Sequence, residues 1–338
     1  MATPASAADW ARKLRREPPD FGISWVLMGG SSVVKSSGKD FPRALRVPCS
    51  VGNATERLEM WMIDRLGVCS WSLQPAGVDE LVERLGACGE RRVQLALCPL
   101  LEHADAWASL RAHTEAGRVV VCSGMMETIG EDYTSLERIK VTGGVRPDEH
   151  WGANLDRATR CADLAHELGL SLVTLHAGFI PEDDPQLHDR MAGRLCRIAE
   201  VFNAKDITVG LETGQERAET LLELLSTIST RARVGVNFDP ANMILYGMGD
   251  PIEAMRALRE HIVQVHMKDA IASDTPGTWG TEVPAGEGQV DWDAFFEIVQ
   301  GLPQGVDVVI EREAGERRVE DIRTAANLAR EQIERVQS

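Results

Sequence analysis

From residue 62 onward, short apolar runs alternate with longer amphipathic segments, and this alternation constrains the fold most. Eight such pairs fill the remaining length of the chain. The apolar runs are rich in Val, Ile and Leu, which is typical of strands buried on both faces of a parallel sheet. Eight strand–helix units in roughly 275 residues favour closure into a barrel over an open sheet. The first run lacks a following G-x-G-x-x-G, which argues against a dinucleotide-binding fold. We therefore predict an α/β protein with a single (β/α)8 TIM barrel over residues 62–338.

Residues 1–61 differ from the rest and form a separate N-terminal extension. Their single apolar patch, 21–30, lies between an Arg- and Pro-rich segment and a Gly/Ser/Lys stretch. No clear small-residue cleavage site follows the patch, so a secretory signal is not indicated. We expect residues 1–61 to be poorly structured or not part of the working protein.

The composition narrows the classes of partner. Acidic residues outnumber basic ones by 52 to 36, for a formal charge of −16. This charge disfavours nucleic acid and anionic membrane surfaces, which both attract basic proteins. No apolar stretch reaches the roughly 18 residues of a membrane span. The seven cysteines include no C-x-x-C pair, which indicates reduced thiols in a cytoplasmic protein rather than a zinc clip.

Four ionisable residues stand at the ends of four successive apolar runs: Glu212, Asp239, His266 and Glu311. The first three are 27 residues apart from one another in turn, as expected for neighbouring strand–helix units. Burying such side chains costs free energy unless they are paired or bind a metal. In a TIM barrel the carboxyl ends of all strands meet at one face. Because three carboxylates and one imidazole suit a hard divalent cation, we predict a single metal site there. The alternative is a set of buried ion pairs, for which Lys268 is the one basic residue at a matching position.

Several segments carry a resemblance to a known family. They are LHAG at 175–178, GLE at 210–212, NFDPAN at 237–242, VHMKD at 265–269, VPAGEGQVDW at 283–292 and IERE at 310–313. Together and in this order, they resemble the sugar phosphate isomerase/epimerase superfamily of xylose isomerase-like TIM barrels. The resemblance covers roughly residues 62–335 and does not select one substrate.

The resemblance implies a function and a set of roles. Glu212, Asp239, His266 and Glu311 would bind one divalent ion, with manganese expected first and magnesium, cobalt or zinc as alternatives. Glu212 and Glu311 would also be the catalytic residues on either side of the reacting carbon. The expected activity is sugar or cyclitol isomerisation or epimerisation, by proton transfer through a metal-bound enediolate. The alternative is a lyase or hydrolase acting on an oxidised sugar, of the inosose dehydratase or keto-glycoside-cleaving kind.

Two positions depart from patterns within the superfamily. Asn242 stands where endonuclease IV and the ketose 3-epimerases have histidine, and Ala272 stands near where the 3-epimerases have arginine. One metal ion is therefore expected rather than three, and an endonuclease-like activity on DNA is the least favoured reading. The expected partner is a small sugar or cyclitol, with neither nucleic acid nor membrane, and a homo-oligomer is compatible with the sequence.

Four further residues are candidates for substrate binding: His176, Asn242, Lys268 and Trp71. Each has a structural alternative. His176 could donate to a nearby carbonyl, Asn242 could cap the turn after Asp239, Lys268 could pair with Asp269, and Trp71 could pack in the core. Two further glutamates have expected roles. Glu313 is expected on the opposite side of its strand from Glu311, in a structural role, and Glu287 is a candidate for a lid over the site.

Overall fold

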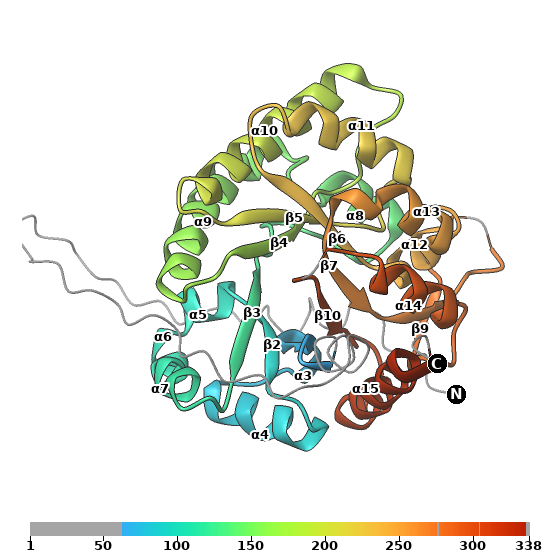
Figure 1. Ribbon diagram of the computed structural model, residues 1–338. Coiled ribbons are helices and arrows are strands. Elements are labelled where there is room, and N and C mark those ends of the chain that lie inside the picture. The colour runs from blue at the N-terminus through green and yellow to red at the C-terminus, as the bar shows by residue number, and fades with distance from the viewer. Residues whose placement is uncertain (1–62, 276, 304, 336–338) are drawn as a thin grey trace, which may run out of the picture.

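The computed structural model describes residues 63–335 apart from 276 and 304, and shows a barrel of parallel strands surrounded by helices (Figure 1). The predicted extension, residues 1–61, lies outside the described residues. The barrel closes in the order β1-β10-β7-β6-β5-β4-β3-β2, which confirms the predicted TIM barrel. Its strands are β1 Leu66–Cys69, β2 Arg92–Ala96, β3 Val120–Met125, β4 Leu172–His176, β5 Thr208–Glu212, β6 Val234–Phe238, β7 Ile262–Met267 and β10 Asp307–Ile310.

Helices follow the strands and pack outside them, and the last helix lies against the first long one to complete the ring. The longer helices are α4 Val78–Cys88, α9 Asp148–Glu167, α10 Pro185–Asn203, α11 Ala218–Ile228, α13 Pro251–Leu258, α14 Trp292–Gln300 and α15 Arg318–Arg335. The shorter ones are α3 Ser70–Leu73, α5 Cys98–Glu102, α6 Ala104–Trp107, α7 Leu110–Glu115, α8 Leu136–Thr142, α12 Pro240–Tyr246 and the 3-10 turn η1 Arg259–His261. None of the helices in the described part of the chain has the length and apolar character needed to cross a bilayer.

Aspartate caps set where several helices begin. The predicted Asp–Pro pairs open α10 and α13, where Asp184 and Asp250 accept backbone N–H groups of the first turn. Proline at the next position has no N–H to leave unpaired and a φ already suited to the helix. Asp291 caps α14 in the same way. These polar caps confirm that the boundaries of these helices are encoded locally.

Two segments differ from what their sequences predict. The pattern over 101–117 predicts one helix, but the structure has α5, α6 and α7, because His103 adopts a non-helical conformation between the first two. The Gly-, Thr- and Pro-rich segment 273–288 predicts a loop, but part of it forms β9 Thr281–Val283, which pairs antiparallel with β8 Asp269–Ile271 as a hairpin.

Asp269 holds this hairpin and the following loop on the barrel. Its buried carboxylate accepts from the backbone N–H groups of Gly286, Gly288 and Val290 and from the indole N–H of Trp292. A Cβ on Gly288 would lie 2.0 Å from an Asp269 oxygen, so only glycine permits this close approach. Asp269 therefore fixes the position of the hairpin, which lines one side of a cavity at this end of the barrel.

Candidate metal centre and active site

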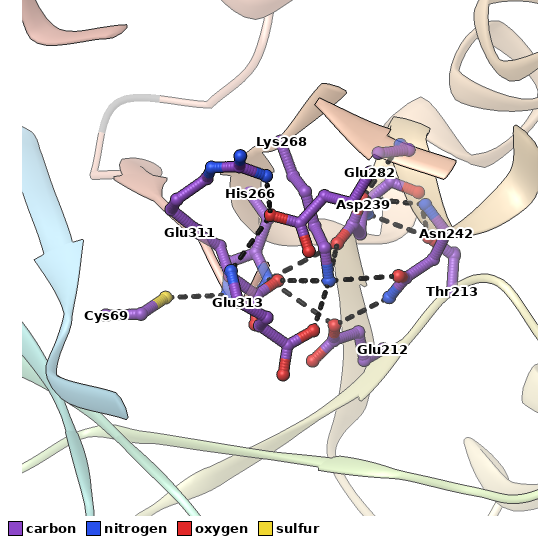
Figure 2. A network of polar contacts seen from close by, with 12 residues as sticks. Cys69, Glu212, Thr213, Asp239, Asn242, His266, Lys268, Glu282, Glu311 and Glu313 are labelled. Atoms are coloured by element: carbon purple, nitrogen blue, oxygen red, sulfur yellow. Dashed lines mark hydrogen bonds and ion pairs between the residues drawn. The ribbon is translucent and has the colours of Figure 1, made fainter. Parts of the chain in front are cut away.

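The four predicted ligands converge at the carboxyl ends of β5, β6, β7 and β10 (Figure 2). One ligand atom from each of Glu212, Asp239, His266 and Glu311 lies within 4.8 Å of the others, and all four side chains are buried. Along the part of the chain that the structure describes, the other metal-competent group is Cys69, His266 and Glu311, which shares two of these residues. The candidate centre is therefore a single one.

Asp239 provides a direct test of whether these residues fit a cation. One carboxylate oxygen, Oδ1, accepts from the N–H groups of Ala241 and Asn242 at 2.8 and 3.0 Å, which caps α12. The other oxygen, Oδ2, is buried, has no hydrogen-bond partner and lies 3.8 Å from His266 Nδ1 and 3.9 Å from the Lys268 ammonium group. A buried carboxylate oxygen that accepts no hydrogen bond is costly unless a cation takes its lone pair. The donor set fits a hard divalent ion, with Asp239 contributing Oδ2.

His266 is oriented by a hydrogen-bond network that crosses the barrel interior. Its Nε2 donates to Gln94 Oε1 at 2.7 Å, and Gln94 in turn donates to Thr174 Oγ1 at 2.8 Å. A proton on Nε2 satisfies the Gln94 oxygen, in competition with the Asn237 amide nitrogen at 3.1 Å, and Nδ1 then faces the carboxylates. Nδ1 lies 3.1 Å from Glu311 and 3.4 Å from Glu212. His266 is thus positioned to use Nδ1 as a ligand.

The surroundings of His266 favour its charged form in the absence of a cation. Burial acts to lower the pKa of His266, but Cys69, Glu212 and Glu311 outweigh it and raise the pKa well above its usual range. Burial also raises the pKa of the Cys69 thiol, so Cys69 is neutral near pH 7 and the two carboxylates carry the effect there. A proton on Nδ1 therefore occupies the place that a metal ion would take.

Glu212 and Glu311 are held as ionised carboxylates. Burial acts to raise both pKa values, but His176 and His266 outweigh it and lower the pKa of Glu212, while Lys268 and His266 hold that of Glu311 well below its usual range. Glu311 also accepts from the Trp71 indole at 2.5 Å. An ionised, oriented carboxylate can accept a proton from carbon.

Lys268 lies at the centre of this charge cluster and does not pair with Asp269. Its ammonium group lies 2.6 Å from Glu313, 3.3 Å from Glu311 and 3.9 Å from Asp239. The expectation for Glu313 is also wrong, since it lines the same cavity as Glu311. Strand β10 ends at Ile310, so the side-chain alternation of a strand does not extend to Glu313. Burial raises the pKa of Glu313 to about 7.

The other substrate-binding candidates all line the cavity. His176 Nε2 lies 3.7 Å from Glu212, and its buried Nδ1 has no hydrogen-bond partner, so the structural alternative, a bond to a carbonyl, is not formed. The Asn242 side chain donates to Glu212 at 3.0 Å and accepts from Lys268 at 3.3 Å, while Asp239 caps the turn instead. Trp71 is nearly buried in α3 and positions Glu311. Glu287 is exposed and is not among the lining residues.

Sequence reasoning missed several residues of this site. Gln94 and Asn237 are polar residues within apolar strands, a signal of a buried network that could have been read from the sequence. Glu127, Tyr133 and Trp279 line the cavity from connecting loops, where no periodic pattern marks them. Burial raises the pKa of Glu127 to about 8, so this carboxyl group is a proton donor near neutral pH.

Comparison with known proteins assigns the family. The family model "Xylose isomerase-like TIM barrel" matches residues 101–337, and the chain belongs to this family. The crystal structure of a xylose isomerase domain protein from Planctomyces limnophilus is similar, with 28% identity, a TM-score of 0.71, and coverage of 80% of this chain and 97% of that one.

More distant similarities concern the fold alone. The structure of an L-ribulose 3-epimerase has 15% identity and a TM-score of 0.62, covering 80% of this chain and 95% of its own. That of the probable 3-DHS dehydratase AsbF from Bacillus anthracis has 17% identity and a TM-score of 0.61, covering 78% of this chain and 98% of its own.

One sequence relative matches part of the chain. The Escherichia coli K12 protein YihM, described as uncharacterised, is 28% identical over 122 residues, or 35% of this chain and 37% of its own length.

Replacing Lys268 with methionine is expected to destabilise the fold in a pH-dependent way. The variant leaves the buried Glu311 and the partly exposed Glu313 without their ammonium partner, at a cost of about 3 kcal/mol near neutral pH. Their folded-state pKa values then rise above the unfolded value, so the loss is larger at about pH 8 than at about pH 5.5, where protonation relieves it. Urea unfolding with EDTA present measures the free energy of unfolding of the variant and of the unsubstituted protein at both pH values.

A matched control is Lys205→Met, which removes a partly exposed pair with Asp163. Its cost is expected to stay below about 1 kcal/mol and to be insensitive to pH. A Lys268→Met loss no greater than that of the control, or equal at both pH values, would contradict the assigned charge cluster.

Proposed function

We propose that this protein is a divalent-metal-dependent isomerase or epimerase acting on a sugar or cyclitol. The observation that carries the proposal is the placement of two ionised carboxylates, Glu212 and Glu311, within one cavity and at 3.4 and 3.1 Å from His266 Nδ1. Two carboxylates beside one site allow one to remove a proton from carbon and the other to return it. Epimerase and isomerase neighbours within the same fold support the same class.

The residues that would hold the ion are Glu212, Asp239, His266 and Glu311, with manganese expected first and magnesium, cobalt or zinc as alternatives. Structural neighbours have been described with bound magnesium and with bound zinc. When bound, the ion would supply Lewis-acid polarisation of a carbonyl and a neighbouring hydroxyl oxygen.

The chain's own residues would perform the proton transfer. Trp71 and Lys268 hold the Glu311 carboxylate, while Asn242 and Asn237 donate to Glu212, so neither group can turn away from the cavity. Each carboxylate stays ionised and can act as the base, and its protonated form then acts as the acid. His176 Nδ1 and the carboxyl group of Glu127, both lacking partners, would bind substrate oxygens.

Exchange of a substrate C–H with heavy water tests this reaction. NMR across ketoses, inososes and 3-keto-glucosides with added Mn²⁺ is expected to show exchange at one carbon. Glu311→Gln and Glu212→Gln are each expected to reduce its rate by at least about 100-fold, because the base is lost. The matched control is Glu287→Gln, an exposed carboxylate outside the cavity, with unchanged exchange.

The outcomes separate the candidate reactions. Exchange with all atoms retained supports an isomerase or epimerase, whereas loss of water or of an aglycone would assign the lyase or hydrolase alternative. Unchanged exchange in both glutamine variants would remove Glu212 and Glu311 from the mechanism. Metal content is measured in each variant, so that loss of the ion is distinguished from loss of the base.

Metal affinity is expected to depend on pH through His266. Because its pKa is raised well above the usual value, His266 carries a proton at neutral pH that must leave Nδ1 before a metal binds. The affinity for Mn²⁺ is therefore expected to rise about tenfold per pH unit between about pH 6 and pH 8, with release of about one proton.

Isothermal titration calorimetry in buffers of different ionisation enthalpy measures both the affinity and the protons released. His188→Gln alters a histidine of α10 outside the cavity and serves as the control with an unchanged slope. Affinity that is constant over this range would show that His266 is not protonated in the metal-free protein.

A further inference from the structure

The cavity around the candidate centre is strongly acidic. Six glutamates line it, and Lys268 is the single lysine or arginine among the described lining residues. The glutamates are Glu127, Glu131, Glu212, Glu282, Glu311 and Glu313. Carboxyl groups are therefore the predominant charged groups that a ligand meets in this space.

The one lining lysine is already neutralised. The Lys268 ammonium group contacts Glu313, Glu311 and Asp239 and donates to the Asn242 carbonyl, so none of its charge is left for a ligand anion. The neighbouring Arg312 is committed in the same way, with ion pairs to Glu282 at 2.7 Å and to Asp321 at 3.0 Å. His176, the other lining side chain that can carry a positive charge, lies 3.7 Å from Glu212. A phosphate or carboxylate bound away from the candidate metal centre would therefore find no uncommitted lysine or arginine on the lining and would lie near carboxylates, which is unfavourable.

Other lining residues are apolar or aromatic. Met125, Met126 and Leu245 are apolar, and Tyr246 and Trp279 form an aromatic wall. The Tyr246 and Trp279 rings pack edge to face with centroids 4.8 Å apart, and the Gly280 N–H bonds to the Leu245 carbonyl at 3.0 Å, which joins the end of α12 to the hairpin. The Tyr246 hydroxyl accepts from Gln215, so it is already partnered. This surface suits an apolar substituent better than the hydroxyl-covered edge of a bare sugar.

We propose that the substrate is an uncharged sugar or cyclitol derivative with an apolar or aromatic substituent, and is neither a sugar phosphate nor a sugar acid. This inference rests on the proposed function for the location of the sugar, and it adds the chemical class of the ligand. The reacting ring lies at Glu212 and Glu311, and the substituent lies against Trp279 and Tyr246. The acidic lining excludes anions, and the aromatic wall selects among neutral ligands.

Two pairs of commercially available probes test the exclusion of anions and the preference for an apolar substituent. Their binding is measured by calorimetry with EDTA present, so that no turnover is needed. The first pair is D-fructose and D-fructose 6-phosphate, for which the neutral sugar is expected to bind at least about tenfold more tightly. The second is methyl and 4-nitrophenyl β-D-glucopyranoside, for which the nitrophenyl ligand is expected to bind at least about tenfold more tightly.

Three variants connect these preferences to the named residues. Trp279→Ala is expected to abolish the nitrophenyl preference, whereas Ile271→Ala, which trims an exposed side chain of the same hairpin outside the cavity, is expected to keep it. Glu313→Gln removes one carboxylate from Lys268 and is expected to improve binding of the phosphate at least about fivefold.

The inference is overturned if the phosphate binds as tightly as fructose, if the nitrophenyl preference is absent or survives in Trp279→Ala, or if none of the four probes binds at about 10 mM. These measurements involve neither metal nor exchange, so they are independent of the test of the proposed reaction. If both binding preferences are found but no C–H exchange, this inference stands and the proposed reaction is wrong. If exchange is found but neither preference, the proposed reaction stands and this inference is wrong.

Discussion

The structure depends on the compensation of buried charge at one end of a closed barrel. Three carboxylates, an imidazole and an ammonium group lie together with almost no exposure to water. Isolated, each of these groups would destabilise the fold, and the cluster persists because opposite charges are adjacent and most oxygen atoms have donors. The exception is Asp239 Oδ2, which is buried without a hydrogen-bond partner and lies close to the other three candidate ligands. The same cluster of buried charged groups thus determines both the stability of this end of the barrel and its candidate chemistry.

A polar layer inside the barrel supports this arrangement from below. Gln94 on β2 contacts His266, Asn237 on β6 contacts Glu212 on the neighbouring strand β5, and Gln264 and Ser123 continue the network. The interior of a TIM barrel is normally filled by branched apolar side chains, so these fully buried polar residues are a local departure with a positioning role. Because β2 lies across the barrel from β7, only closure of the sheet brings Gln94 to His266.

Much of the fold and of the candidate centre could be predicted because the signals are local and repeated. Glu212, Asp239, His266 and Glu311 follow strands that any reading of apolar periodicity finds, and barrel closure then brings them together. Glu313 and Lys268 were misplaced because their contacts depend on the exact end of a strand and on partners far along the chain. Trp279 and Glu127 were missed because they lie on irregular connections, whose path is set by tertiary contacts such as those of Asp269. The role of Asp239 as the N-cap of α12 was likewise visible only in the structure.

The central claim is that Glu212, Asp239, His266 and Glu311 hold one divalent cation. Crystals grown with Mn²⁺ and measured near the manganese absorption edge test it most directly, because anomalous scattering locates the ion without reference to activity. We predict one anomalous peak within about 2.5 Å of Asp239 Oδ2, His266 Nδ1 and an oxygen of each glutamate. A map with no peak at this position, or with an ion held by residues other than these four, would contradict the account.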